Sequence, residues 1–172
     1  MKKIASISFL IFMLSLTALS QEKKWAVGAK VGEPAGLNIR RYSDERAFEV
    51  NIGTYGGLWG QNRGYRKGHY NSVGLTVNAN YLWHGNLFKK EFSKYYYGFG
   101  AQFNNRKYFP KDQSQAQGVA TLSIGGDALA GLEFFVPDSP LSIFLEAGTY
   151  VEVLPSPIFM HIQSGIGARF NF

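Results

Sequence analysis

Few side chains in this sequence have the types and spacing needed for acid–base or nucleophilic chemistry. Of the three histidines, His161 has a serine nearby, at Ser164. Successive side chains of a strand point to opposite faces, so a spacing of three separates the two residues. A base and its nucleophile must lie within hydrogen-bonding distance of each other. We therefore interpret His161 as a residue at the end of a loop and Ser164 as an ordinary strand residue.

Carboxylates form the second group with possible chemistry. Glu146 and Glu152 share one face of an alternating segment, and Glu49 and Asp127 could join them. Paired carboxylates can act as an acid and a base, but basic residues lie on the same set of polar faces, so a structural charge network is expected instead. Its predicted members are Lys30, Arg40, Glu49, Asp127, Glu146, Glu152 and Arg169. We expect no catalytic residue, cofactor or metal site.

The segments that hold these residues alternate between apolar and polar side chains. A period of two indicates strands with one apolar and one polar face. The 20 glycines, 10 tyrosines and 14 phenylalanines also favour an all-β chain with many turns. We expect eight strands, at residues 25–31, 37–42, 47–55, 73–83, 95–103, 121–136, 141–153 and 165–172.

The connections between the expected strands differ in length on the two sides of the sheet. Short turns follow the second, fourth and sixth strands, whereas longer polar loops, 57–68 and 104–118, follow the third and fifth. This asymmetry is typical of a transmembrane barrel. A meander of eight strands must also close, because free edges of this length would promote aggregation.

Periodicity alone leaves open which face points inward. The apolar face fills a soluble lipocalin-like barrel but contacts lipid in a membrane barrel. Three features favour the membrane barrel: the polar face is rich in glycine, its charges have both signs, and the aromatics of the apolar face gather near one end of the strands. Those aromatics are Trp25, Phe48, Tyr81, Trp83, Tyr95, Phe134, Phe170 and Phe172.

The N-terminal residues have the plan of a secretory signal peptide. Lys2 and Lys3 precede an apolar run at 4–16, and the small residues Ala18 and Ser20 follow it. The run is shorter than the roughly 20 residues that a spanning helix needs. We predict a signal peptide at 1–20 and a barrel at 21–172. The absence of cysteine excludes disulfides and thiol chemistry. The net charge falls from +6 to +4 when Lys2 and Lys3 are removed, which is too small to indicate nucleic acid binding.

The last residues, GIGARFNF, contain a glycine and spaced aromatics and finish in phenylalanine. Gly167, Phe170 and Phe172 resemble the C-terminal assembly signal of bacterial outer-membrane β-barrels. In that family the last strand closes on the first, and the barrel-assembly machinery recognises the terminal aromatic. With the alternating strands and the signal peptide, the whole mature chain resembles the small eight-stranded outer-membrane barrels of the OmpA/OmpX type.

The resemblance implies an all-β fold, an eight-stranded antiparallel up-and-down transmembrane β-barrel. It also implies an integral outer-membrane location and a monomer surrounded by outer-membrane lipid and lipopolysaccharide. Eight strands leave room inside for side chains and little else, so we expect a structural or surface-interaction role and not a general porin.

The longer loops offer cations beside aromatics, which suit contact with phosphate or sugar, and lipopolysaccharide phosphates would be the nearest partner. The candidates are Trp59, Arg63, Tyr65, Arg66, Lys67, Arg106 and Lys107. Loops that carry charges for solubility alone are the simpler alternative.

Two other function classes stay open. The first is an outer-membrane enzyme acting on lipid or lipid A, since lipid A deacylase barrels are similar in size; their His and Ser, however, lie two residues apart on the lipid-facing side. The second is a soluble periplasmic or secreted lipocalin-like barrel that binds a ligand.

Overall fold

The structure is a computed structural model that describes residues 24–55, 63–90, 92–111 and 118–172. The described part consists of nine strands and one short 3₁₀ helix. The elements are β1 (Trp25–Glu33), β2 (Ala35–Ser43), β3 (Arg46–Tyr55), β4 (Arg63–Tyr65), β5 (Gly68–Asn86), η1 (Leu87–Lys89), β6 (Ser93–Pro110), β7 (Val119–Phe135), β8 (Leu141–Leu154) and β9 (Phe159–Asn171). In this part of the chain, no helix is long and apolar enough to cross a membrane.

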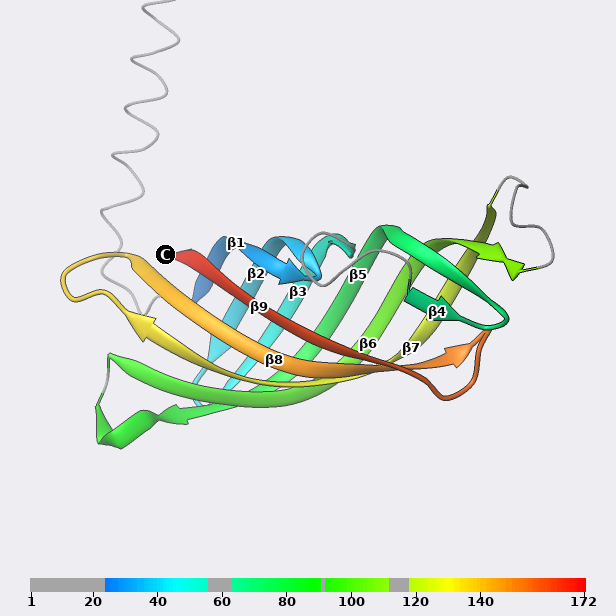
Figure 1. Cartoon of the computed structure of the whole chain (residues 1–172). Coiled ribbons are helices and arrows are strands. Elements are labelled where there is room, and N and C mark those ends of the chain that lie inside the picture. The colour runs from blue at the N-terminus through cyan, green and yellow to red at the C-terminus, as the bar shows by residue number, and fades with distance from the viewer. Residues whose placement is uncertain (1–23, 56–62, 91, 112–117) are drawn as a thin grey trace, which may run out of the picture.

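Eight of the strands form a closed antiparallel barrel, as the alternating pattern predicted (Figure 1). Each barrel strand pairs with the next barrel strand along the chain, β3 pairs with β5 because β4 lies outside this order, and β9 pairs with β1. β4 is an additional strand of three residues that forms a hairpin with the start of β5. We call the end with the β2–β3, β5–β6 and β7–β8 connections the short-turn end and the opposite end the β4 end.

The last strand closes the barrel along the full length of the first. The pairing runs from Ala26 with Asn171 to Glu33 with Ser164. The final residue is part of this closure, because the Trp25 amide donates to the Phe172 carbonyl at 3.0 Å and the Phe172 amide donates to the Trp25 carbonyl at 2.8 Å. Figure 1 shows the C-terminus beside the start of β1.

The strands differ in length, which the sequence analysis did not predict. β1 to β3 have 9, 9 and 10 residues, whereas β5, β6 and β7 have 19, 18 and 17. The expected loop at 104–118 begins as a continuation of β6 to Pro110. This extension was missed because its two faces are both largely polar, with Asn104 inside and Asn105 outside, so the apolar alternation that indicates a strand is lost. The β4 end therefore has a wall of long strands on one side.

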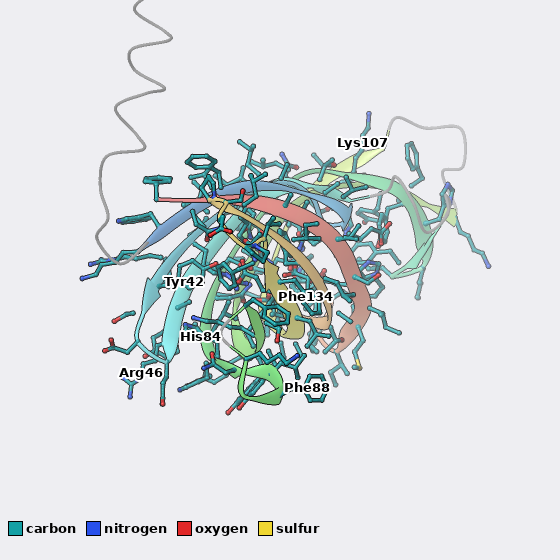
Figure 2. The ribbon with its side chains drawn as sticks, turned by 90° about the vertical axis from the view of Figure 1, so that its left-hand side faces the viewer. Tyr42, Arg46, His84, Phe88, Lys107 and Phe134 are labelled. Carbon is teal, nitrogen blue, oxygen red and sulfur yellow. The ribbon has the colours of Figure 1, made fainter. Side chains whose placement is uncertain are left out.

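Burial follows the orientation expected for a membrane barrel. Charged side chains fill the interior, where Arg40 and Arg169 are each only 1% exposed. Aliphatic side chains cover the outside, where Val31 and Leu37 are each 59% exposed. Figure 2 shows side chains on both sides of the barrel wall, with Lys107 pointing away from the barrel. A small apolar cluster of Ala47, Leu82, Tyr96 and Leu129 is the main apolar part of the described interior. The barrel is therefore polar inside and apolar outside, the reverse of a soluble domain.

Two inward-facing glycines make room for aromatic rings on the neighbouring strand. Tyr96 of β6 lies directly opposite Gly131 of β7, and Phe144 of β8 lies directly opposite Gly167 of β9. A Cβ atom added at Gly131 would lie 2.4 Å from Tyr96 Cζ, and one added at Gly167 would lie 2.4 Å from Phe144 Cζ. In a narrow barrel, each large ring needs a position without a side chain beside it.

We expect Gly131→Ala to lower the free energy of unfolding by about 1–3 kcal/mol, the usual cost of overpacking a filled interior. Urea unfolding of the barrel in detergent measures this loss. Gly126→Ala on the same strand is the matched control, because the nearest atom to its added Cβ would be the Gly100 carbonyl oxygen at 3.7 Å. Equal stability of the two variants would contradict the packing argument.

Candidate functional site

The interior at the short-turn end contains a ring of four charges from four strands. Arg40 of β2 pairs with Glu49 of β3 at 2.5 Å and with Glu133 of β7 at 3.1 Å. Arg169 of β9 pairs with the same two carboxylates, at 2.8 Å and 3.0 Å. All four side chains are at most 1% exposed. Each carboxylate thus bridges both arginines, and this charge ring is neutral overall.

Further hydrogen bonds and aromatic rings surround the charged groups of the charge ring. Glu133 accepts hydrogen bonds from the Tyr42 hydroxyl at 2.9 Å and from the Ser142 hydroxyl at 2.7 Å. The Arg40 guanidinium carbon lies 4.0 Å from the centroid of the Tyr96 ring, and that of Arg169 lies 3.5 Å from the centroid of the Phe144 ring. Buried charges are tolerated when they are paired and hydrogen-bonded in this way.

A second ion pair lies beside the charge ring. Lys30 Nζ is 2.5 Å from Glu146 Oε1, and both side chains are 4% exposed. The Tyr96 hydroxyl donates to the other Glu146 oxygen at 3.1 Å, which connects this pair to the ring that stacks on Arg40. Asp127 accepts a long hydrogen bond of 3.3 Å from the Asn78 amide.

The β4 end of the interior holds a separate group around Arg106, which we call the Arg106 cluster. Arg106 Nη1 pairs with Glu152 at 2.7 Å, and the Tyr65 hydroxyl donates to the same carboxylate at 2.6 Å. The Arg106 guanidinium carbon lies 4.3, 4.6 and 5.1 Å from the ring centroids of Tyr65, Tyr70 and Phe159. Burial, and then the hydrogen bond to Glu152, raises the pKa of the Tyr65 hydroxyl. The β4–β5 hairpin thereby places its own tyrosine inside the barrel.

The structure places all seven residues of the predicted charge network inside the barrel. Six of them form ion pairs, and Asp127 is held by an asparagine. Glu133 was not among the predicted members, although it has the same alternation as Asp127 on the same strand and could have been found from that pattern. His161, expected at the end of a loop, is instead buried in β9, and its Nε2 lies 3.1 Å from Glu33 Oε2.

The predicted surface-loop contacts need a larger correction. Tyr65 is 1% exposed and Arg106 is 2% exposed, so neither can contact a partner outside the barrel. Arg106 lies inside because the alternation of β6 continues through the segment that was expected to be a loop. Arg66, Lys67 and Lys107 are exposed. Trp59 and the side chain of Arg63 lie outside the described part of the structure.

A band of aromatic rings surrounds the outside of the short-turn end. The rings of Tyr81 and Trp83 lie 5.0 Å apart, and Trp83 lies 6.0 Å from Tyr97 and 5.6 Å from Phe99. The outward aromatics predicted from the sequence belong to this band, and Phe48, Tyr95 and Phe170 are among its exposed members. Rings at this position are typical of a membrane–water interface.

The comparisons with known proteins identify the fold. No protein-family profile and no curated protein sequence match the chain. Among solved structures, it is similar to the N-terminal β-barrel domain of Pseudomonas aeruginosa OprF, with a TM-score of 0.62, 13% identity, and 88% of this chain and 100% of that chain covered. It is also similar to Neisserial surface protein A, with a TM-score of 0.54, 13% identity, and 86% and 93% covered. At this identity, the likeness shows the fold alone.

Lys30 and Glu146 should be strongly coupled in a double-mutant cycle. Lys30→Met or Glu146→Gln alone leaves a buried charge without its partner, which costs about 3–5 kcal/mol of unfolding free energy. The double variant should lose less than the sum of the two single losses. Urea unfolding in detergent measures the three values. Pairing Glu146→Gln with the exposed Lys107→Met supplies an additive control, and additivity in the Lys30 cycle as well would refute the pair.

Tyr65→Ala should release the β4–β5 hairpin. Cleavage by trypsin after Arg66 or Lys67 in the folded, detergent-solubilised barrel should accelerate roughly tenfold, the increase in open population expected when local opening becomes about 1.4 kcal/mol easier. Mass spectrometry of the fragments locates the cuts. Tyr65→Phe keeps the ring against Arg106 and should be cleaved much more slowly. Identical cleavage of all three proteins would show that Tyr65 does not hold the hairpin.

Proposed function

We propose that this protein is an integral outer-membrane β-barrel with a filled interior and a structural or surface-interaction role. The observation that carries the proposal is the inverted burial of the barrel, with ion pairs inside and aliphatic side chains outside. In water, such a continuous apolar surface would far exceed the patches of a few hundred Å² that soluble monomers expose. In a bilayer, the same surface contacts hydrocarbon.

The dimensions of the short strands support a membrane position. A transmembrane strand needs about 9–11 residues, and β1, β2 and β3 have 9, 9 and 10. The aromatic band lies where these strands meet the short turns, which face the periplasm in barrels of this kind. Arg41 is a cation on this outer surface, and its guanidinium carbon lies 5.5 Å from the centroid of the Trp25 ring.

The outer membrane is the membrane that best fits the other observations. Of the solved structures with a similar fold, one is the β-barrel domain of OprF and another is a Neisserial surface protein. The predicted signal peptide at 1–20 would export the chain, and GIGARFNF, which ends in Phe172, resembles the signal recognised by the barrel-assembly machinery. Lipopolysaccharide and outer-membrane lipid would then surround a monomer.

The filled interior favours a structural or surface role over transport. The charge ring, the Lys30–Glu146 pair and the Arg106 cluster occupy successive levels of the barrel. Each of these groups is neutralised by its own partners, so none offers a free charge to a passing solute. Outside, Arg66, Lys67 and Lys107 are exposed at the β4 end and remain the candidates for contact with lipopolysaccharide phosphates.

Ile39→Arg should separate the membrane barrel from a soluble one. Ile39 faces outward at the centre of the short strand β2, and an arginine near the middle of a bilayer costs about 2–4 kcal/mol of unfolding free energy. Unfolding of the barrel in phospholipid vesicles measures this cost.

Leu122→Arg is the matched control for this experiment. Leu122 also faces outward, with 59% of its surface exposed, but lies on β7 beyond the last residue that pairs with β8. Its replacement should change stability by less than about 0.5 kcal/mol, as at an ordinary surface position. If both arginines were equally harmless, the proposed membrane location would be wrong, and a soluble lipocalin-like barrel would take its place.

A further inference from the structure

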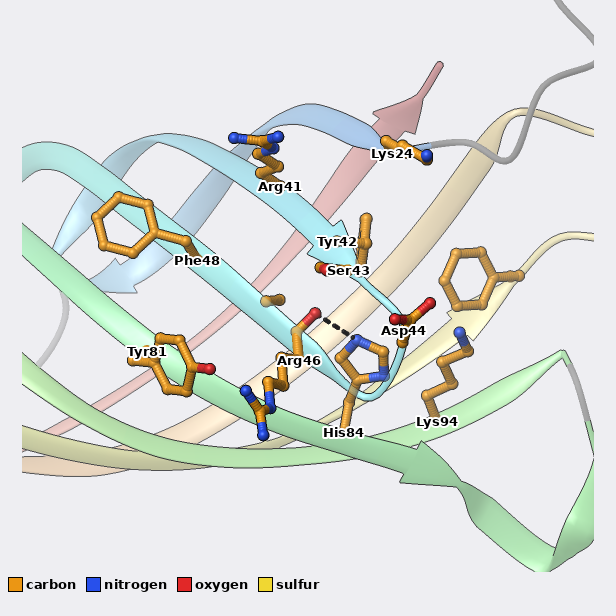
Figure 3. A pocket seen from close by; sticks show the side chains of 12 residues that line it. Lys24, Arg41, Tyr42, Ser43, Asp44, Arg46, Phe48, Tyr81, His84 and Lys94 are labelled. Atoms are coloured by element: carbon orange, nitrogen blue, oxygen red, sulfur yellow. Dashed lines mark hydrogen bonds between the residues drawn. The ribbon is translucent and has the colours of Figure 1, made fainter.

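A cavity of about 870 Å³ lies at the short-turn end of the barrel, against the β2–β3 turn. Its lining includes the outward side chains Arg41, Arg46, Phe48 and Tyr81, which we call the rim site (Figure 3). The cavity also touches side chains at the mouth of the barrel interior, such as Tyr42 and His84. The cavity therefore lies where the outer wall of the barrel meets its short-turn end.

The register of three strands creates the rim site. Arg41 of β2 lies opposite Phe48 of β3, which in turn lies opposite Tyr81 of β5. Arg46 precedes Phe48 by two residues, so it projects from the same outer face one step closer to the turn. Phe48 is 51% exposed and Tyr81 is 39% exposed. Two arginines and two rings thus share one outer face at the edge of the apolar surface.

The charge of the cavity is strongly positive. Lys24, Arg41, Arg46 and Lys94 line it, and among the described residues Asp44 is the one carboxylate in its lining. Inside the barrel, Arg40, Arg106 and Arg169 all pair with glutamates. Among the residues that the structure describes, the guanidinium groups of Arg41 and Arg46 make no hydrogen bond to a carboxylate, and the Arg41 guanidinium lies over the Trp25 ring. Their donors are therefore available to an anion.

The surface next to the rim site fits a lipid better than a free anion. The rows of the outer wall directly beyond Arg41 and Phe48 are aliphatic, with Ile39 opposite Val50 and Leu37 opposite Ile52. A planar guanidinium binds phosphate through two parallel hydrogen bonds. A ligand with a phosphate at one end and hydrocarbon at the other would satisfy both parts of the surface.

We propose that the rim site binds an anionic phospholipid of the leaflet at the short-turn end. Arg41 and Arg46 hold the headgroup phosphate, and an acyl chain lies against Phe48, Tyr81 and the aliphatic rows beyond them. This inference rests on the proposed membrane location. Anionic lipid is favoured over zwitterionic lipid because the cavity offers an excess of positive charge that a zwitterionic headgroup does not need.

The test uses the mature barrel refolded into vesicles of phosphatidylcholine that contain a minority of phosphatidylglycerol. After extraction in mild detergent, native mass spectrometry measures the lipid that stays bound. Phosphatidylglycerol should be enriched over its share in the vesicle. Arg41→Gln combined with Arg46→Gln should reduce this enrichment roughly tenfold or more, since two cations near a membrane surface are lost.

Two controls make the outcome specific. Lys90→Gln with Lys111→Gln removes the same charge from two exposed positions outside the cavity lining and should leave the enrichment unchanged. Inorganic phosphate, added as a competitor at constant ionic strength, should not displace the lipid, whereas displacement would identify a simple phosphate site and overturn the lipid assignment.

Insertion is measured on the same samples, so the two proposals can fail separately. Heat-modifiable gel mobility and protection from protease report whether the barrel has folded into the bilayer. If the wild type inserts but retains phosphatidylglycerol only in proportion to its share, the rim site is wrong and the membrane location stands. If the wild type stays outside the vesicles, the membrane location itself is wrong.

Discussion

The neutral ring of Arg40, Glu49, Glu133 and Arg169 is the interaction on which the rest of the barrel depends. Its members come from β2, β3, β7 and β9, so the ring exists only when the sheet has closed and β9 has reached β1. Before closure, two arginines and two glutamates would each lack half of their partners. Removing either arginine from water without both carboxylates would cost several kcal/mol. The sheet closes and the four charges are neutralised in the same step. The interior charges therefore favour the complete barrel over any open sheet.

The arginines also determine where the glycines must be. Each guanidinium stacks on an aromatic ring, Arg40 on Tyr96 and Arg169 on Phe144. Each ring in turn lies across from a glycine, because a narrow lumen cannot hold a ring and a further side chain at one level. Glycine weakens an isolated strand, but it is required at these positions because the ring opposite it stacks on a buried arginine. Two glycines of the polar face, Gly131 and Gly167, are thus a consequence of burying arginine in an eight-stranded barrel.

The sequence predicted the strand number, the antiparallel order and the inward polar face, since all three follow from the alternation of side chains. It predicted less of the interior contacts. Lys30 and Glu146 lie 116 residues apart, and β8 does not neighbour β1 in the sheet, so their pairing depends on the stagger of the closed barrel. Arg106 and Tyr65 were assigned to the surface because polar residues occupy both faces of their segments. Where both faces are polar, alternation no longer distinguishes a strand from a loop, and the extensions of β5 and β6 were missed for this reason.

Because the strands differ in length, the edge of the barrel at the β4 end is uneven, low at β1 to β3 and high at β5 to β7. In a bilayer, the turn between β1 and β2 would end close to the headgroups. β5, β6 and β7 would instead continue outward as a ridge with the β4 hairpin attached to it. A molecule that approaches the barrel from this end would meet the ridge first. It would contact the outward side chains of the ridge, such as Lys107, whereas Arg106 of the same strand is held inside.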